Sequence, residues 1–372
     1  MESPRLFCWP DSVQELLLRA TIEECDAARR SWELWTPQID IDILEEGSVR
    51  LLPETYTHLK SCGVEHALFR LIKGVKRKTW LQNQLLFHQA GAAIRILQGL
   101  GLETMVTKGP ALVLRHYLDY GRRPMADFDI VIKKEGVEEA VKALHENGFR
   151  LKDQDHDASD RSLTHALSYV NETGRQFDLH WQVIPGCTDE QLFWDDATPV
   201  AVAETMTLAP SATDLLFHVC VHGLRLNRVH PFRWVVDAAV ILKDSQVDWD
   251  RFRHLSSRLW MGHHTSEALK FLTRFDVDIP DHVLSALSRN NLASLQRLEF
   301  ELNTGLRRKS IGTQIAIMWL GFSRFADSKA GGFRIAQLPD YLKRIWGVDS
   351  VWRLPIMAVQ KGIRRIFLNP AG

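Results

Sequence analysis

The sequence predicts an α+β protein in which a small mixed β-sheet is flanked by helical regions. Apolar residues recur at helical spacing before residue 100 and again after residue 211, whereas short alternating runs typical of strands lie between residues 103 and 181. With 372 residues, 45% of them apolar, the chain can build a sizeable core in more than one domain. We expect a helical region over 1–100, an α/β core over 101–186, a helical domain over 187–300 and a helical segment over 301–372.

Each element follows from its local pattern. Residues 80–97 place apolar side chains every three or four positions, and Gly99 and Gly101 end this helix. Gly148 ends the helix before one strand, and residues 171–174 form a turn between two others. Ser211 is a suitable N-cap for the helix that follows it. The expected core strands are 103–107, 127–132, 149–152, 165–170 and 175–181. The other expected helices are 110–120, 135–147, 211–226, 233–243 and 250–260.

Charge and cysteine content exclude several classes of protein. Lys plus Arg and Asp plus Glu both total 46, so net charge alone attracts neither nucleic acid nor membrane. Five scattered cysteines without a CxxC pair argue against a disulfide framework or zinc ribbon and fit a reducing compartment. The first thirty residues show no secretory pattern, and the longest apolar stretch, 311–322, is shorter than the roughly 20 residues of a spanning helix. We expect a cytoplasmic protein without a transmembrane segment.

The C-terminal segment is strongly basic. Between Arg307 and Gly372, twelve Lys or Arg stand against three Asp, interleaved with Trp and Phe. Such a segment can contact an acidic partner, nucleic acid or an anionic membrane surface. Packing against the acidic remainder of the same molecule explains the pattern equally well, so both alternatives stay open.

Three aspartates are the candidate catalytic residues and metal ligands. Asp127 and Asp129 are two apart on an expected strand, so their side chains share one face. Neighbouring carboxylates repel each other, and a hard divalent cation such as Mg²⁺ removes that repulsion. Asp178 lies on a later strand with polar residues on one face. Carboxylates on adjacent strands can hold two metal ions about 4 Å apart.

Candidate phosphate-binding residues precede the carboxylates. Lys108 and Gly109 lie where a strand turns into a helix, so free amides, a small residue and an ammonium group can cradle phosphate. Arg122 and Arg123 can grip phosphate oxygens with their paired donors. The structural alternatives are an exposed loop lysine and salt bridges from the arginines to Asp119 or to the carboxylate strand.

Three histidines have both a functional and a structural explanation. His180 shares a face with Asp178 and can lie near the metal ions, supporting their ligands rather than binding them, although a buried, hydrogen-bonded histidine is the preferred interpretation. His218 and His222 are four apart on a helix, which is a spacing for metal ligation. No HExxH motif accompanies them, so helix packing is the preferred interpretation.

The motifs together resemble a known superfamily. Lys-Gly, then Asp-x-Asp on a strand, then a single Asp on a later strand is similar to the nucleotidyltransferases that include polymerase beta-like and aminoglycoside-modifying enzymes. Residues 107–112 (TKGPAL), 122–129 (RRPMADFD) and 177–181 (FDLHW) resemble more closely the bacterial family of stand-alone, uncharacterised nucleotidyltransferase-like proteins. The resemblance covers roughly residues 30–290.

The resemblance implies a function and roles for individual residues. The segment 101–186 would be the nucleotidyltransferase core, with Asp127 and Asp129 ligating two Mg²⁺ ions, Mn²⁺ being the alternative. Asp178 would complete the second metal site and help to activate an acceptor hydroxyl, and Gly109 would approach the triphosphate. The expected reaction moves a nucleoside monophosphate from a nucleoside triphosphate, ATP by preference, to a hydroxyl of a small molecule, peptide or protein, releasing pyrophosphate.

Two other functions remain open at this stage. A nucleotide-binding or scaffold protein with weak catalysis on the same fold is favoured by Gly109-Pro110, where the superfamily usually has Gly-Ser or Gly-Gly. Retention of all three carboxylates favours the enzyme. A metal-dependent phosphodiesterase also uses carboxylate clusters, but few histidines lie near the Asp motifs.

Overall fold

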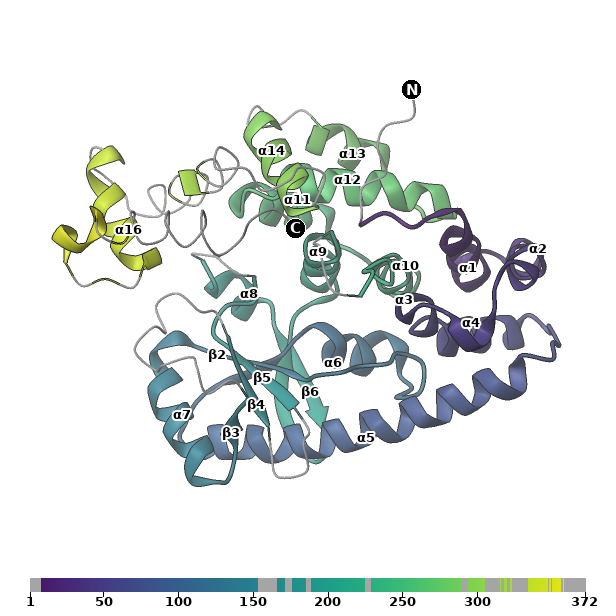
Figure 1. Ribbon diagram of the computed structural model, residues 1–372, viewed down its shortest axis with the longest axis horizontal. Coiled ribbons are helices and arrows are strands. Elements are labelled where there is room, and N and C mark those ends of the chain that lie inside the picture. The colour runs from purple at the N-terminus through teal and green to yellow at the C-terminus, as the bar shows by residue number, and fades with distance from the viewer. Residues whose placement is uncertain are drawn as a thin grey trace.

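The predicted α+β class is confirmed by the computed structural model, in which helices surround one seven-stranded mixed sheet (Figure 1). The structure describes residues 8–152, 166–170, 176–184, 189–224, 229–288 and 293–304, with shorter stretches between 315 and 357. The strands are β1 (Thr104–Val106), β2 (Asp129–Ile132), β3 (Arg150–Leu151), β4 (Ala166–Val170), β5 (Gln176–His180), β6 (Thr198–Val202) and β7 (Thr205–Ala209).

The helices fall into three groups along the chain. Those before the sheet are α1 (Ser12–Ile22), α2 (Cys25–Trp35), α3 (Glu46–Val49), α4 (Leu52–Ser61) and α5 (Phe69–Gly99). Those between strands are α6 (Lys108–Leu112), α7 (Val137–Glu146) and α8 (Gln191–Asp195). Those after the sheet are α9 (Ala212–Gly223), α10 (Trp234–Asp244), α11 (Trp249–Arg258), α12 (Gly262–Leu272), α13 (Asp281–Ser288), α14 (Ala293–Asn303) and α16 (Leu338–Trp346).

The sheet has the order β3-β4-β5-β2-β1-β7-β6. At its centre β2 is antiparallel to β1 and parallel to β5, and both β1 and β2 are buried along their whole length. Parallel neighbours need a long connection, and the chain between β2 and β5 provides it through α7, β3 and β4. This register fixes which residues of β2 and β5 stand opposite each other.

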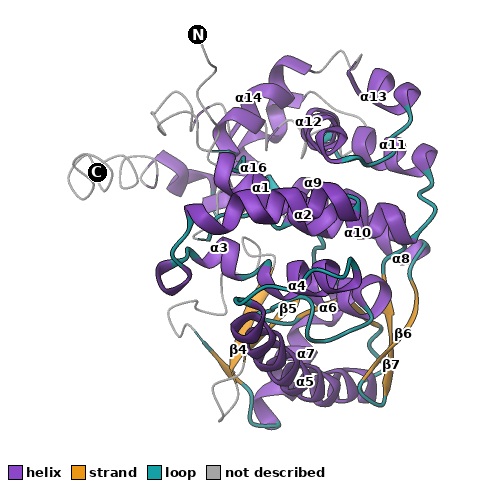
Figure 2. Cartoon of the chain, turned by 90° about the vertical axis from the view of Figure 1, so that its right-hand side faces the viewer, coloured by secondary structure: helices purple, strands orange, loops and turns teal. Residues whose placement is uncertain are grey.

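Helices cover the sheet and join it to the rest of the chain. Figure 1 shows α5 running beneath the sheet and α9 and α10 above it. The 31-residue α5 packs on β1, β5, β6 and β7, with Phe87 edge-on to Phe128 at a centroid distance of 5.0 Å. On the other side α6 contacts both β2 and α9, and α1 contacts α10 (Figure 2). The buried residues from these elements form one continuous core, so the helical regions are held against the strands.

Most expected elements are present, with one clear omission. The hydroxyl of Ser211 caps α9 by accepting from the amide of Asp214 at 3.3 Å, as predicted. The segment 187–300, expected to be helical, also contains β6 and β7, which extend the sheet from β1. The pattern concealed β7 because Thr207 is buried there while Met206 is exposed. Thr207 is satisfied by donating to the carbonyl of Thr104 at 2.7 Å.

The expected helix over 110–120 has a different form. It begins earlier, at Lys108, and after α6 its backbone widens into a π-helix over Val113–Tyr117. Leu118, in the left-handed region with φ of 52°, ends it. Its Tyr117 side chain is thereby buried against α10, where its hydroxyl donates to Asp237 at 2.8 Å.

The cysteine content was interpreted wrongly for one pair. Cys25 at the start of α2 and Cys62 at the end of α4 form a disulfide, whereas Cys8 and Cys220 are free and buried. The two partners are 37 positions apart. Their pairing depends on how α2 and α4 lie together, which sequence spacing alone does not show.

The domain boundaries stay predictions, although β6 and β7 place strands of the common sheet inside the segment 187–300. Among the described residues, no helix combines the length and apolar character needed to cross a membrane. Most of the basic segment after Arg307 and the turn expected at 171–174 lie outside the described residues.

Candidate functional site

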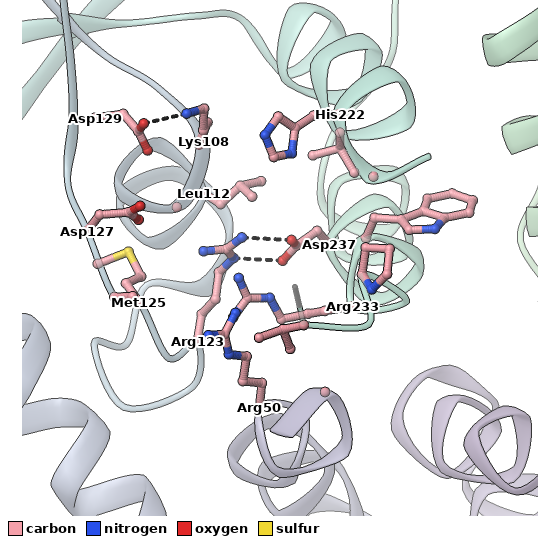
Figure 3. Close-up of a pocket in the computed structure, with 18 of the residues that line it drawn as sticks. Arg50, Lys108, Leu112, Arg123, Met125, Asp127, Asp129, His222, Arg233 and Asp237 are labelled. Carbon is pink, nitrogen blue, oxygen red and sulfur yellow. Dashed lines mark hydrogen bonds and ion pairs between the residues drawn. The ribbon is translucent and has the colours of Figure 1, made fainter. Parts of the chain in front are cut away.

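A cavity of about 610 Å³ lies where the sheet meets the helices that follow it (Figure 3). Its walls come from α3, the start of α6, the segment before β2, α9 and the start of α10. This volume is in the range of small-molecule sites, which are typically about 300–1,000 Å³. The cavity therefore has room for a nucleotide-sized ligand.

Asp129 and Asp178 are brought together by the pairing of β2 with β5. They are register partners in this parallel pair, and the amide of Asp178 donates to the carbonyl of Phe128 at 2.8 Å. Asp129 is buried and lines the cavity, while Asp178 is half-buried directly beside it. Asp129, Asp178 and His180 each offer a ligand atom, and these atoms lie within 4.8 Å of one another. The group fits a divalent metal ion.

Asp127 lies in the same cavity but before the strand rather than on it, because β2 begins at Asp129. Its side chain is exposed at the cavity wall. Desolvation by the surrounding protein, followed by repulsion from Asp129 and Asp178, raises the pKa of Asp127. The raised pKa of Asp127 therefore reflects, in part, electrostatic repulsion among the three carboxylates. Asp127 is nevertheless not one of the three residues whose ligand atoms lie within 4.8 Å of one another.

Lys108 neutralises the most buried of the carboxylates. Its Nζ donates to Asp129 Oδ1 at 2.5 Å, and His180 Nε2 lies 2.9 Å from the same oxygen. Burial alone would raise the pKa of Asp129, but Lys108 and His180 more than offset this and hold it well below its usual range. Burial lowers the pKa of Lys108, and the Asp129 charge outweighs that effect and raises it. Lys108 is thus a charged group in contact with the carboxylate pair.

The backbone at Lys108 and Gly109 is closely fitted to its surroundings. Lys108 has a φ of 52°, an uncommon conformation for a residue with a side chain. A Cβ at Gly109 would lie 2.6 Å from Nη1 of Arg123 and 2.7 Å from Sδ of Met125. A side chain at this position would have to displace Arg123 or Met125, so glycine allows α6 to lie close to the segment before β2.

The two arginines predicted to bind phosphate both make ion pairs. Arg122 donates from Nε and Nη2 to the carboxylate of Glu54, each at 2.7 Å, and is not among the residues lining the cavity. Arg123 lines the cavity and donates from Nε and Nη2 to Asp237, each at 2.8 Å. Burial alone would raise the pKa of Asp237, but Arg123 outweighs it and lowers the pKa. Their phosphate-binding roles stay predictions.

The segment before β2 is held from several directions. The buried Asn83 of α5 donates from Nδ2 to the carbonyl oxygens of Tyr120 and Arg123, at 2.7 and 2.8 Å. Lys76 of α5 pairs with Asp119 at 2.9 Å. These contacts fix the backbone that leads to the carboxylates, and none of them is predictable from local pattern.

Sequence reasoning missed two cationic residues of the cavity, Arg50 and Arg233. Arg50 is the C-cap of α3 and Arg233 immediately precedes α10, and both extend toward Arg123 in Figure 3. The sequence pattern identifies Arg233 only as the first residue of an expected helix. The two residues are far apart in the chain, and local sequence patterns do not show that their helices lie together.

His218 and His222 line the cavity as well. Their rings are stacked with centroids 5.3 Å apart on one face of α9. Helix packing therefore stays a prediction for both residues. Figure 3 shows His222 across the cavity from Asp127 and Asp129.

The comparison with known families now decides the class of protein. The model of a family described as uncharacterised nucleotidyltransferase matches residues 48–275, more than half of the chain. The chain belongs to this family. No curated protein matches it. Family membership supports transfer chemistry on a nucleotide substrate, and the matched region contains every residue of the cavity named above.

Proposed function

We propose that the protein transfers a nucleoside monophosphate from a nucleoside triphosphate, ATP being the expected donor, to an acceptor hydroxyl. The hydroxyl oxygen forms a bond to the α-phosphorus, the bond from that phosphorus to the bridging oxygen of the β-phosphate breaks, and pyrophosphate leaves. The observation that carries the proposal is the pairing of Asp129 with Asp178 beside a cavity of suitable size in a member of this family.

The residues present fit a divalent metal. Two carboxylates and one imidazole converge, and Asp127 adds a carboxylate at the cavity wall. Oxygen donors suit Mg²⁺, and the imidazole of His180 extends the choice to Mn²⁺. We assign Asp127, Asp129 and Asp178 as the residues that would hold two ions. His180 would orient Asp129 through its contact with that carboxylate. Bound Mg²⁺ would supply neutralisation of the triphosphate charge.

The chain's own residues perform the remaining tasks in this proposal. Asp178, the more accessible member of the strand pair, accepts the proton of the acceptor hydroxyl. Lys108, held at Asp129 in the cavity wall, supplies an ammonium group for phosphate oxygens. Gly109 lets the backbone of α6 approach the ligand without an intervening side chain. Most of the rate acceleration would come from positioning and charge.

A direct assay tests the proposal. Labelled triphosphates with each of the four bases are incubated with the full chain, Mg²⁺ or Mn²⁺, and a cell extract as the source of acceptor. We expect labelled product together with an equal amount of pyrophosphate, and no reaction with EDTA. Identification of the labelled species would name the acceptor. Pyrophosphate-free hydrolysis to nucleotide and phosphate would instead indicate a hydrolase.

A nucleotide-binding protein with weak catalysis is the second candidate. The observation in its favour is that Lys108 already satisfies Asp129, with Pro110 directly after Gly109. In this alternative the lysine replaces a metal ion as the counter-charge of the carboxylates. Calorimetry with Mg²⁺ and a non-hydrolysable triphosphate, beside the turnover assay, separates binding without chemistry from catalysis.

Two further assignments from the sequence remain proposals. The basic segment after Arg307 would contact an acidic partner, which a pull-down with and without that segment would test. A cytoplasmic location would leave the Cys25–Cys62 pair reducible in the cell, so thiol labelling before and after lysis tests it.

A further inference from the structure

Three guanidinium groups meet on the side of the cavity away from Asp129 (Figure 3). They belong to Arg50, Arg123 and Arg233, and all three line the cavity. Two of them have carboxylate partners, since Arg123 pairs with Asp237 and Arg50 pairs with the exposed Glu46. The third has no ion pair of its own among the described residues.

Arg233 is that third cation. Its Nη1 donates to the carbonyl of Pro124 at 2.6 Å, and none of the ion pairs between described residues includes it. A guanidinium carries five N–H donors, so one carbonyl leaves several for a ligand. Burial, followed by repulsion from Arg123, lowers the pKa of Arg233 to about 10, and the group is therefore still charged at neutral pH.

The arginine group and the carboxylates belong to one cavity. Arg123 and Arg233 line it together with Asp127 and Asp129. A ligand bound by the arginines would therefore lie next to the carboxylates of the proposed reaction centre. The cavity is continuous from Lys108 to Arg233.

We infer that Arg233, with Arg50 and Arg123 beside it, binds a phosphate group inside the cavity. A phosphate dianion offers acceptor oxygens in the geometry that guanidinium forks match, and it relieves the repulsion among three neighbouring cations. The inference deepens the proposed function, and it rests on that function only for the identity of the molecule that carries the phosphate. The carrier is either the triphosphate donor, through its β and γ phosphates, or a phosphorylated acceptor.

Calorimetric titration of the full chain with pyrophosphate in the presence of EDTA tests the site. We expect measurable binding by the wild type and a loss of about tenfold or more in Arg233→Gln, because charge-assisted hydrogen bonds are removed. Arg233→Lys should fall between the two. The control is Arg253→Gln, which removes an exposed arginine paired with Asp250 away from the cavity and should bind as the wild type does.

Equal affinity of Arg233→Gln and Arg253→Gln for pyrophosphate, or absence of binding by the wild type, would overturn the inference. Circular dichroism and thermal unfolding establish that each variant is folded. If Arg233→Gln does not fold, Arg50→Gln takes its place. Arg50 is half-buried at the end of a short helix, and its replacement should weaken binding severalfold. Unchanged affinity in that variant would also overturn the site.

Two further experiments separate this inference from the proposed function and identify the molecule that carries the phosphate. Asp129→Asn should abolish nucleotidyl transfer but should not weaken metal-free pyrophosphate binding, because it removes a negative charge from the cavity and frees Lys108, so either claim can fail alone. The carrier is then tested by titrating phosphate into protein saturated with Mg²⁺ and a non-hydrolysable ATP analogue. Loss of phosphate binding assigns the arginines to the triphosphate, whereas retained binding assigns them to a phosphorylated acceptor.

Discussion

The two charged sides of the cavity are built in different ways. The acidic side is a product of strand pairing, because β2 and β5 place Asp129 opposite Asp178 through backbone register. The basic side is assembled from residues far apart in the chain, since Arg50, Arg123 and Arg233 come from three separate elements. Backbone hydrogen bonds fix the first, and side-chain ion pairs fix the second.

This difference separates the expected effects of mutation. Removing a carboxylate of the acidic side leaves the strands paired, so the chemistry should suffer more than the fold. Removing a partner from the basic side leaves a buried charge without its counter-charge, so the fold should suffer directly. Activity and stability measured on the same variants therefore show how the sides differ.

The largest expected effect is the loss of activity in Asp129→Asn. Asparagine keeps the size of the side chain but removes the charge that would hold a metal ion. We expect nucleotidyl transfer to fall by at least about 10³-fold, equivalent to roughly 4 kcal/mol of transition-state stabilisation. Pyrophosphate release measures the effect, with Asp250→Asn at an exposed surface pair as the control. Transfer at the wild-type rate would remove the acidic side from the reaction.

The next effect is the loss of stability in Asp237→Ala on the basic side. Arg123 and the Tyr117 hydroxyl both depend on Asp237, and all three side chains are buried. Leaving Arg123 buried without a partner should cost about 3–5 kcal/mol, measurable by urea unfolding. Asp250→Ala, whose partner Arg253 is exposed, should cost less than about 0.5 kcal/mol. Similar costs for the two variants would contradict the importance assigned to the buried pair.

The junction between the two sides should respond to Gly109→Ala. A Cβ there collides with the paired guanidinium of Arg123 and with Met125, which must move. We expect a loss of about 1–3 kcal/mol in stability and lower activity, since the distortion reaches both sides. Gly74→Ala is a matched control, because this glycine lies inside α5 with no atom within 4 Å of its added Cβ. That variant should gain about 0.5–1 kcal/mol from helix propensity.

The acidic side was largely predictable from the sequence because its signals are local. Alternation around Asp129 and Asp178 indicates strands, and both side chains follow from that period. Only the position of Asp127 differs, since β2 starts two residues later than the alternation suggested. Even the supporting place of His180 follows from its spacing to Asp178, although its contact with Asp129 needed the register of a neighbouring strand.

The basic side was not predictable for the opposite reason. Arg122 and Arg123 were recognised as guanidinium groups near the carboxylates, but their partners Glu54 and Asp237 lie 68 and 114 positions away. The same limit concealed the Cys25–Cys62 disulfide and β7, in which the buried Thr207 hydrogen-bonds to Thr104 of β1. Each of these features depends on a tertiary contact, which cannot be predicted from local hydrophobic periodicity.

The smallest expected effect is on the stability of the metal-free protein, where Asp127 and Asp129 should contribute with opposite signs. The pKa of Asp127 is raised in the folded protein, so its ionisation opposes folding at neutral pH. Asp127→Asn should therefore stabilise the metal-free protein at pH 7, by about 0.5 kcal/mol or less because solvent screens this exposed group. The gain should vanish below about pH 4, where Asp127 is protonated in both states.

Asp129 should show the opposite sign in the same experiment. Its folded pKa is lowered, so its stabilising contribution is present above the unfolded pKa of about 4 and is lost as the pH falls toward the folded value. Asp129→Asn should destabilise at pH 7, and the difference from the wild type should shrink in acid. Thermal unfolding in EDTA at pH 7 and in acid measures both variants. If both variants changed the stability in the same direction, the contact between Lys108 and Asp129 would not stabilise the charged form of Asp129 as proposed.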